Sequence, residues 1–346
     1  MRERAVAETT PIPQIYQEEA NRLASSEAAS AMLPVLQSID TTLYRARRQC
    51  LPPLPDDRAD IVVPESLRFT EASESFVLLQ MLNNDIMVFG SPADFDDVPL
   101  LYVLMGSKER ATYVSLFRGL KDLAVTRGRR FSPQFILSDF ESGLIPAIRD
   151  EFPHVHHQGC YFHLTQALWR KVQQLGMVQY YTHNNPVKDA IRRVMALGFL
   201  PVEEVHLGLE LIRLSLTGLD RMILGDFLEY FQRQWCEAIP IGMWNVHGMQ
   251  RRTNNNCEGW HHKFNQSIRH HHPNIWELIE CLRSEQCTSV RERLQIGVGQ
   301  QVQRTLLRYR RANQRRDNLR GQYGAGDIDI LEYLKEVGRI IVDRMS

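Results

Sequence analysis

Apolar and polar residues alternate differently in the two parts of the chain. Five short apolar runs predict strands, at 75–81, 86–90, 98–105, 134–138 and 155–160. Between the third and fourth runs, apolar residues recur every three or four positions over 108–125, which predicts an amphipathic helix. Beyond His163 only the helical period remains. The pattern therefore predicts an α/β core followed by a large helical part.

Helical patterns also extend on both sides of this core. Two polar helices are expected at 15–31 and 33–47, and the proline-rich run 51–55 marks a boundary. After His163 the period predicts eight helices, at 164–174, 186–197, 202–215, 218–237, 254–269, 275–294, 301–320 and 328–345.

An acid directly follows one of the predicted strands. The run from Phe135 to Ser138 ends at Asp139, and a strand that presents a carboxylate at its C-terminal end commonly fixes a metal ligand. The next predicted strand leads into Cys160 and His163, spaced as Cys-x-x-His. That spacing supplies only half of a zinc site, so we expect a buried cysteine beside a hydrogen-bonded histidine and no zinc.

The segment 252–265 is the richest in polar and aromatic side chains. Its spacing predicts one apolar helical stripe, formed by Cys257, Trp260, Phe264 and Ile268. A neighbouring face carries Glu258, His262 and Asn265. A carboxylate beside histidine and amide groups on a rigid helix suits a divalent metal or a proton transfer. A solvated surface helix explains the same spacing, and the pattern alone leaves both interpretations open.

Taken together, these segments resemble the Mutator-like element (MULE) transposases, a branch of the DDE transposases. The matching segments are 138–141, 159–163, 244–245 and 252–261, with supporting similarity at 113–117, 196–201 and 272–276. The resemblance extends from about Arg58 to the last residue, and it is specific because the segments occur together in this order.

The resemblance implies a ribonuclease H-like core in which three acids hold two divalent metal ions, usually Mg²⁺ and alternatively Mn²⁺. Such ions activate water and then a DNA 3′-hydroxyl for displacement at phosphorus. Position by position, Asp139 corresponds to the second acid and Glu258 to the third, as catalytic residues and metal ligands. The resemblance also places four residues close to the site: Cys160, His163, His261 and Asn265. The implied partner is DNA, at transposon ends.

The first acid of the family is missing. The family carries it in an Asp-Gly-Thr-Phe strand ahead of the segment that matches 98–105, and the chain contains no Asp-Gly-Thr. Two strands, or about thirty to forty residues, are absent between 86–90 and 98–105 by ordinary strand and loop lengths. The acids nearest to this gap are Asp94, Asp96 and Asp97. We therefore expect impaired chemistry, because a bridging ligand is lacking.

The expected fold class is α/β, a ribonuclease H-like core with an incomplete sheet, a large all-α insertion and a helical C-terminal region. The expected domains are a helical N-terminal linker region at 1–55 and the core at 56–163, followed by the insertion at 164–250 and the Glu258 helix with the C-terminal helices at 251–346.

Charge says little about DNA binding when it is taken over the whole chain. The 41 basic and 41 acidic residues balance, so any basic surface must be local. On a helix one face would carry Arg304, Arg308, Arg311 and Arg315, a spacing suited to phosphate contacts. An ordinary solvated helix face is the alternative.

Composition narrows the class of protein. The chain is 43% hydrophobic and 24% charged, as in globular proteins, and lacks the long apolar run of a membrane span. Neither a signal peptide nor a disulfide framework is expected, because no apolar segment opens the chain and its six cysteines are scattered, so we expect a nuclear or cytosolic protein.

Three functions then compete: an active transposase, a degenerate or domesticated relative that keeps DNA contact, and a helical protein-interaction module without a nucleic-acid role. The acids and the Cys-x-x-His signature favour the first two, and the missing acid favours the second. The oligomeric state stays open.

Overall fold

A computed structural model describes residues 1–7, 12–24, 28, 31–49, 52–70, 72–82, 84–90, 101–249, 252–253, 255–268, 273–297 and 307–342. The chain divides into two compact units. The first unit comprises Met1–Lys108, Ser115–Phe131 and Trp260–Gln300, and the second comprises Glu109–Val114, Ser132–Gly259 and Gln301–Ser346.

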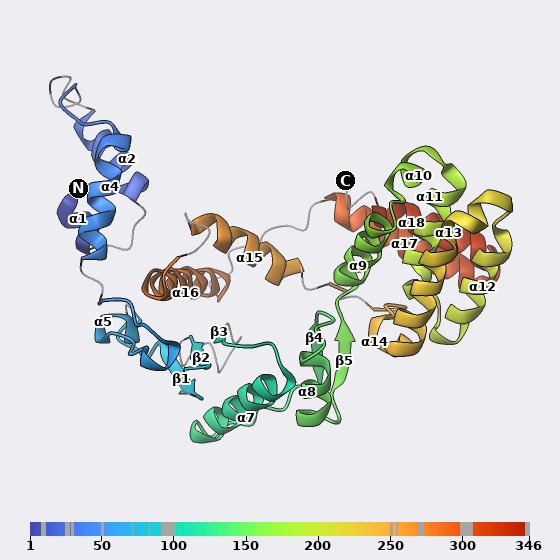
Figure 1. The fold of residues 1–346 in the computed structure, drawn as a ribbon, viewed down its shortest axis with the longest axis horizontal. Helices are drawn as coiled ribbons and strands as arrows, with labels where there is room; N and C mark the ends of the chain where they lie inside the picture. The colour runs from blue at the N-terminus through green and yellow to red at the C-terminus, as the bar shows by residue number, and fades with distance from the viewer. Residues whose placement is uncertain are drawn as a thin grey trace. The chain divides into compact units, whose positions relative to one another are not determined.

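The first unit begins with three helices, α1 (Arg2–Ala7), α2 (Ile12–Leu23) and α4 (Leu36–Arg48), which lie against one another (Figure 1). Their small shared core consists of Ala5, Ile12, Ile15 and Leu43. Two short helices follow, η1 (Arg58–Asp60) and α5 (Glu65–Arg68). Helices α2 and α4 confirm that the N-terminal region is helical, as predicted. Helix α1 and the two short helices were not predicted, because each is too short to show a helical period in the sequence.

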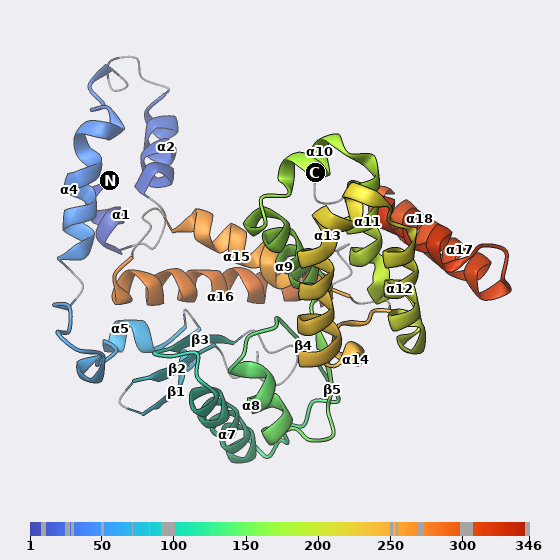
Figure 2. The ribbon, with the colours of Figure 1, turned by 45° about the vertical axis from the view of Figure 1, so that its right-hand side comes forward.

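The first unit also contains an antiparallel sheet of β1 (Val77–Met81), β2 (Ile86–Phe89) and β3 (Tyr102–Met105), with β2 in the middle (Figure 2). All four residues of β2 are buried, as expected for a central strand. Helices α15 (Asn255–Ser267) and α16 (Ile275–Gly297) contribute to the same core, which includes Phe76, Phe89, Tyr102, Phe264 and Trp276. The strands predicted at 75–81 and 86–90 are confirmed, and they pair as an antiparallel hairpin.

The second unit holds a parallel pair of strands, β4 (Phe135–Ser138) and β5 (His156–Gly159), paired from Phe135↔His156 to Ser138↔Gly159. Helix α8 (Leu144–Glu151) forms the crossover that a parallel pair requires. The first turn of α7 (Arg110–Thr126) also belongs to this unit, where the Arg110 guanidinium lies 2.6 Å from the Asp150 carboxylate.

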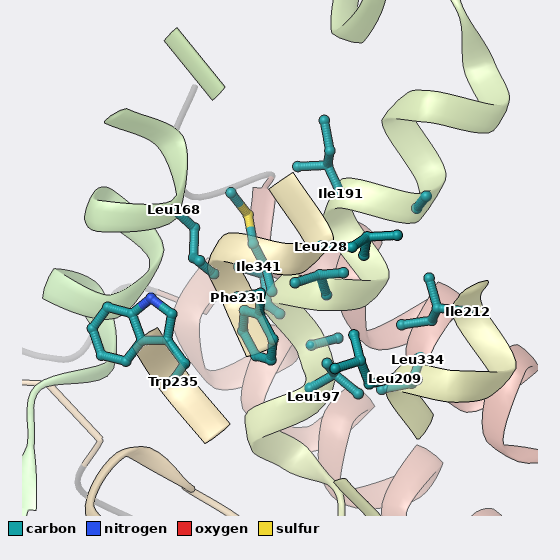
Figure 3. Close-up of a cluster of buried hydrophobic side chains, with 14 of the residues drawn as sticks. Leu168, Ile191, Leu197, Leu209, Ile212, Leu228, Phe231, Trp235, Leu334 and Ile341 are labelled. Atoms are coloured by element: carbon teal, nitrogen blue, oxygen red, sulfur yellow. The ribbon is translucent and has the colours of Figure 1, made fainter. Parts of the chain in front are cut away.

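Helices form the rest of the second unit. They are α9 (Tyr161–Gln174), α10 (Val178–His183), α11 (Asn185–Ala196), η2 (Leu197–Phe199), η3 (Val202–Glu204), α12 (Val205–Ser215), α13 (Gly218–Phe231), α14 (Ile241–Trp244), α17 (Leu307–Ala325) and α18 (Ile330–Val342). A π-helical segment, η4 (Gln232–Ala238), continues α13 and buries Trp235. Figure 3 shows the shared core, where Ile191, Leu197, Phe231 and Leu334 converge from four of these elements. The predicted all-helical pattern after His163 is thus confirmed in the described residues.

Buried hydrogen bonds join β5 to the helices. The Tyr161 hydroxyl donates to the Met195 carbonyl oxygen at 2.6 Å, and the Trp244 indole N–H donates to the Trp235 carbonyl oxygen at the same distance. The Gln158 amide on β5 donates to the Asn245 carbonyl oxygen at 3.1 Å. We call this set of contacts the strand–helix junction. The Asn245 side-chain amide also donates to the Leu200 carbonyl oxygen at 2.8 Å, so the segments 196–201 and 244–245 meet beside the junction.

The strands form two sheets in the described residues, one of three strands and one of two. The mixed α/β class is therefore confirmed, while a ribonuclease H-like core stays a prediction. The sequence lacks the two strands expected around the first acid, between the segments that form β2 and β3. Among the described residues, every helix is too short or too polar to cross a bilayer.

The strand–helix junction generates a stability prediction at Gly159. A Cβ there would lie 2.3 Å from the Phe140 ring, which packs edge-on against Trp235 with centroids 4.8 Å apart. We expect Gly159→Ala to lower the free energy of unfolding by about 1–3 kcal/mol, because the ring has to leave that packing. The matched control is Gly225→Ala in α13, where a Cβ meets nothing within 4 Å, and which should stabilise the helix slightly. Equal chemical denaturation midpoints for both variants would contradict the packing account.

Candidate functional site

Asp139 lies immediately after β4, half-buried, at the carboxyl end of the parallel pair. Side-chain bonds fix this strand end. The Ser138 hydroxyl donates to the Asp139 carbonyl oxygen at 2.8 Å, and its oxygen lies 2.8 Å from Nε2 of His157 on β5. If the hydroxyl donates to the carbonyl, Nε2 of His157 is the donor in the second bond. The backbone that presents Asp139 is therefore held from both strands.

Two further oxygen groups gather near Asp139. The Tyr113 hydroxyl, which is nearly buried on α7, hydrogen-bonds the Glu141 carboxylate. Burial, this bond, and the negative charges of Glu141 and Asp139 raise the pKa of Tyr113 well above its ordinary range. The phenol therefore stays protonated and neutral. We call Asp139, Glu141 and Tyr113 the strand-end site.

The sequence reasoning missed Glu141 and Tyr113 as members of this site. Tyr113 belongs to the predicted inward face of the helix at 108–125, and Glu141 follows Asp139 by two positions in the matching segment. The sequence offered no other signal for these two residues, because the contact between Tyr113 and Glu141 depends on tertiary packing.

Cys160 and His163 lie at the junction of β5 and α9. Cys160 is fully buried at the N-cap position of α9, and its N–H donates to the Ser138 carbonyl oxygen at 2.7 Å. His163 lies one turn later, half-buried, with its ring edge-on to Phe162. The signature thus adjoins the strand that presents Asp139, while its role beside a metal site stays a prediction.

The third predicted acid is described only through its backbone. Glu258 lies in α15, and its side chain, like that of Cys257, lies outside the described residues. Residues Asp94, Asp96 and Asp97 also lie outside them. The convergence of Asp139 with Glu258 accordingly stays a prediction.

The remainder of α15 belongs to the first unit. Trp260 stacks on Phe264 with ring centroids 4.9 Å apart, and its indole N–H donates to Glu285 at 3.0 Å. His261 and Asn265 are exposed to solvent. The apolar stripe is confirmed at Trp260 and Phe264, and the described part of the polar face is solvated.

The predicted arginine face is described in part. Arg304 and the side chain of Arg308 lie outside the described residues. Arg311 and Arg315 are exposed on α17, and Arg315 lies 3.3 Å from the Glu336 carboxylate. Phosphate contact by this face stays a prediction.

The donor set at the strand-end site consists of oxygen atoms, the ligand type that Mg²⁺ prefers. Asp139 and Glu141 supply its carboxylates. Among the described residues, however, no three His, Cys, Asp or Glu side chains gather as a metal-binding group. A metal pair at this strand end therefore needs a carboxylate from elsewhere in the chain.

His157 gives this site a pH dependence. Burial, and secondarily the neighbouring His156, lowers the pKa of His157 below its ordinary value. The unfolded chain therefore binds this proton at a higher pH than the folded chain does. The contribution of His157 to stability is complete above about pH 6.5 and is lost as the pH falls from there toward the lowered pKa.

We expect His157→Asn to reduce the loss of stability that the protein shows between pH 7 and pH 5. Urea denaturation at each pH measures the effect, with His154→Asn at an exposed turn position as the control. An unchanged pH dependence in His157→Asn would exclude the proposed protonation cost.

Residues 85–167 match the family model of the MULE transposase domain. The matched segment contains β2, β3, α7, β4, α8 and β5 and reaches into α9, so it includes Asp139, Glu141, Cys160 and His163. No curated protein and no solved structure matches the chain. The chain is therefore a protein with a MULE transposase domain, which the sequence resemblance had predicted.

Proposed function

We propose that this chain is a transposase-derived protein whose ancestral role is metal-dependent cleavage and transfer of DNA strands. We further propose that it is a degenerate or domesticated member that keeps DNA contact and acts in the nucleus. The observation that carries the proposal is the position of Asp139 at the carboxyl end of β4, inside the segment that matches the MULE model.

Asp139 and Glu258 would hold Mg²⁺ or Mn²⁺ in this proposal. A bound ion supplies Lewis acidity and activates the attacking oxygen. The surrounding residues supply position. Ser138 and His157 fix the backbone of Asp139, and the neutral Tyr113 phenol orients Glu141 by a hydrogen bond. This support preorganises one carboxylate corner of a site for phosphoryl transfer.

Loss of chemistry follows from what the chain lacks. The strand of the first acid would supply a bridging carboxylate, and its sequence is absent. With one bridging ligand missing, the scissile phosphate is positioned poorly, so strand transfer should fall by orders of magnitude. Glu141 does not restore the geometry, since it sits two residues from Asp139 on the same loop and is already engaged by Tyr113.

The test is nicking of supercoiled DNA by the full chain with Mg²⁺ or Mn²⁺. We expect nicking near the background, unchanged in Asp139→Ala, Glu258→Ala and the surface control Asp226→Ala. Efficient nicking that the first two substitutions abolish and the control leaves intact would show an active transposase. Mutation of Asp94, Asp96, Asp97 and Glu141 would then locate the compensating acid.

A further inference from the structure

A group of arginines in the second unit lies apart from the strand-end site. Arg252 and Arg316 both face the ring of Phe199, with guanidinium carbons 5.6 and 5.8 Å from its centroid. Phe199 itself is nearly buried in η2. Its ring therefore packs against two guanidinium groups and helps to hold both of them in place.

The same two side chains share one neutral acceptor. Arg252 donates from Nη2 to the Asn313 side-chain oxygen at 3.2 Å, and Arg316 donates to that oxygen as well. Arg316 also donates from Nε to the Ala312 carbonyl oxygen at 3.3 Å and is only 7% exposed. Ordered guanidinium groups lose little side-chain entropy when they bind a ligand.

A third arginine joins them around Tyr333. Burial raises the pKa of Tyr333 to about 12, against the opposing charges of Arg320, Arg316 and Arg252. The Tyr333 hydroxyl donates to the Phe199 carbonyl oxygen at 3.2 Å. Nη1 of Arg320 lies 3.9 Å from the position of a Cβ on Gly248, and Nδ1 of the preceding His247 lies 2.7 Å from the same carbonyl oxygen. We call Arg252, Arg316 and Arg320 the Phe199 arginine cluster.

The local sequence is rich in positive charge. Helix α17 contains six arginines and one acid, Asp317, which lies 3.6 Å from the Arg320 guanidinium. Cations held this close repel one another, and a bound anion relieves that repulsion. Guanidinium forks match the oxygens of a phosphate in charge and in shape.

Main-chain bonds connect this cluster to the strand that presents Asp139. The Arg252 carbonyl oxygen accepts from the Tyr161 N–H at 2.9 Å. The preceding residue, Cys160, donates its N–H to the Ser138 carbonyl oxygen at 2.7 Å. All of these residues belong to the second unit. The cluster and the end of β4 are therefore parts of one framework.

We propose that the Phe199 arginine cluster binds the phosphate backbone of DNA, with Arg252 and Arg320 in contact with phosphate and Arg316 as a positioning residue. The proposal rests on the proposed function, since DNA is the substrate that function requires. It differs from the predicted face of Arg304, Arg308, Arg311 and Arg315. On α17, Arg316 and Arg320 share a face at i and i+4, and Arg315 lies on another.

The experiment measures binding of the full chain to a fluorescein-labelled DNA duplex by anisotropy over a range of salt concentrations. We expect Arg252→Gln and Arg320→Gln each to weaken binding roughly tenfold, as for a lost charge-assisted hydrogen bond. Each should lower the slope of log affinity against log salt by about one. The matched control is Arg310→Gln at an exposed position of α17 outside both arginine sets, which removes an equal charge from the same helix and should leave both quantities nearly unchanged.

A fourth variant separates positioning from charge. Asn313→Ala removes the acceptor that Arg252 and Arg316 share and leaves every cation in place, so we expect weaker binding with the salt slope retained. Because Arg320 is exposed, Arg320→Gln should fold normally, and circular dichroism checks this. If Arg252→Gln fails to fold, the binding of Arg320→Gln decides the outcome. Wild-type binding that Arg320→Gln leaves intact, or that Arg310→Gln weakens equally, overturns the cluster and leaves the proposed function standing. A wild-type chain without affinity for DNA overturns both.

Discussion

The second unit depends on the buried contact between the end of β5 and the helices. Tyr161 stands at the start of α9, and its hydroxyl reaches the Met195 carbonyl oxygen, where no water competes for the bond. A buried acceptor left without its donor costs about 1–3 kcal/mol, so this contact fixes where the strand ends relative to the helical core. The Trp244 and Gln158 bonds act in the same place. The strand–helix junction is thus the framework on which both Asp139 and the Phe199 arginine cluster are mounted.

A transposase has two structural requirements, one for DNA contact and one for DNA cleavage. DNA contact needs cations on a rigid surface, and the second unit provides ordered guanidinium groups for it. Cleavage needs three carboxylates brought together by a continuous sheet, and the described strands form two sheets instead. In the proposed function, loss of a short central segment would remove the second capability without touching the residues that serve the first.

Local pattern predicted the elements correctly where a single period dominates, as in β1, β2, α9, α11, α12 and α13, but it missed the short helix α10. It could not give contacts that depend on tertiary packing. The helical period predicted that Tyr113 faces inward from α7. Its hydrogen bond to Glu141 could not be predicted in the same way, because Glu141 belongs to a separate segment of the chain. Nothing in the sequence indicated that Arg316, outside the predicted arginine face, is buried against the ring of Phe199, which lies far away in the chain. An incomplete ribonuclease H-like sheet was predicted, and because the described strands form two sheets, that core stays a prediction.

Mn²⁺ binding tests the central claim most directly, namely that the chain keeps a carboxylate corner but not a two-metal site. Titration of the full chain with Mn²⁺, followed by electron paramagnetic resonance in the presence of DNA, counts the ions and detects any magnetic coupling between them. The account predicts weak binding of at most one ion per chain, uncoupled and lost in Asp139→Asn. Two tightly bound, coupled Mn²⁺ ions would contradict it, because a pair about 4 Å apart requires the bridging carboxylate that the chain lacks.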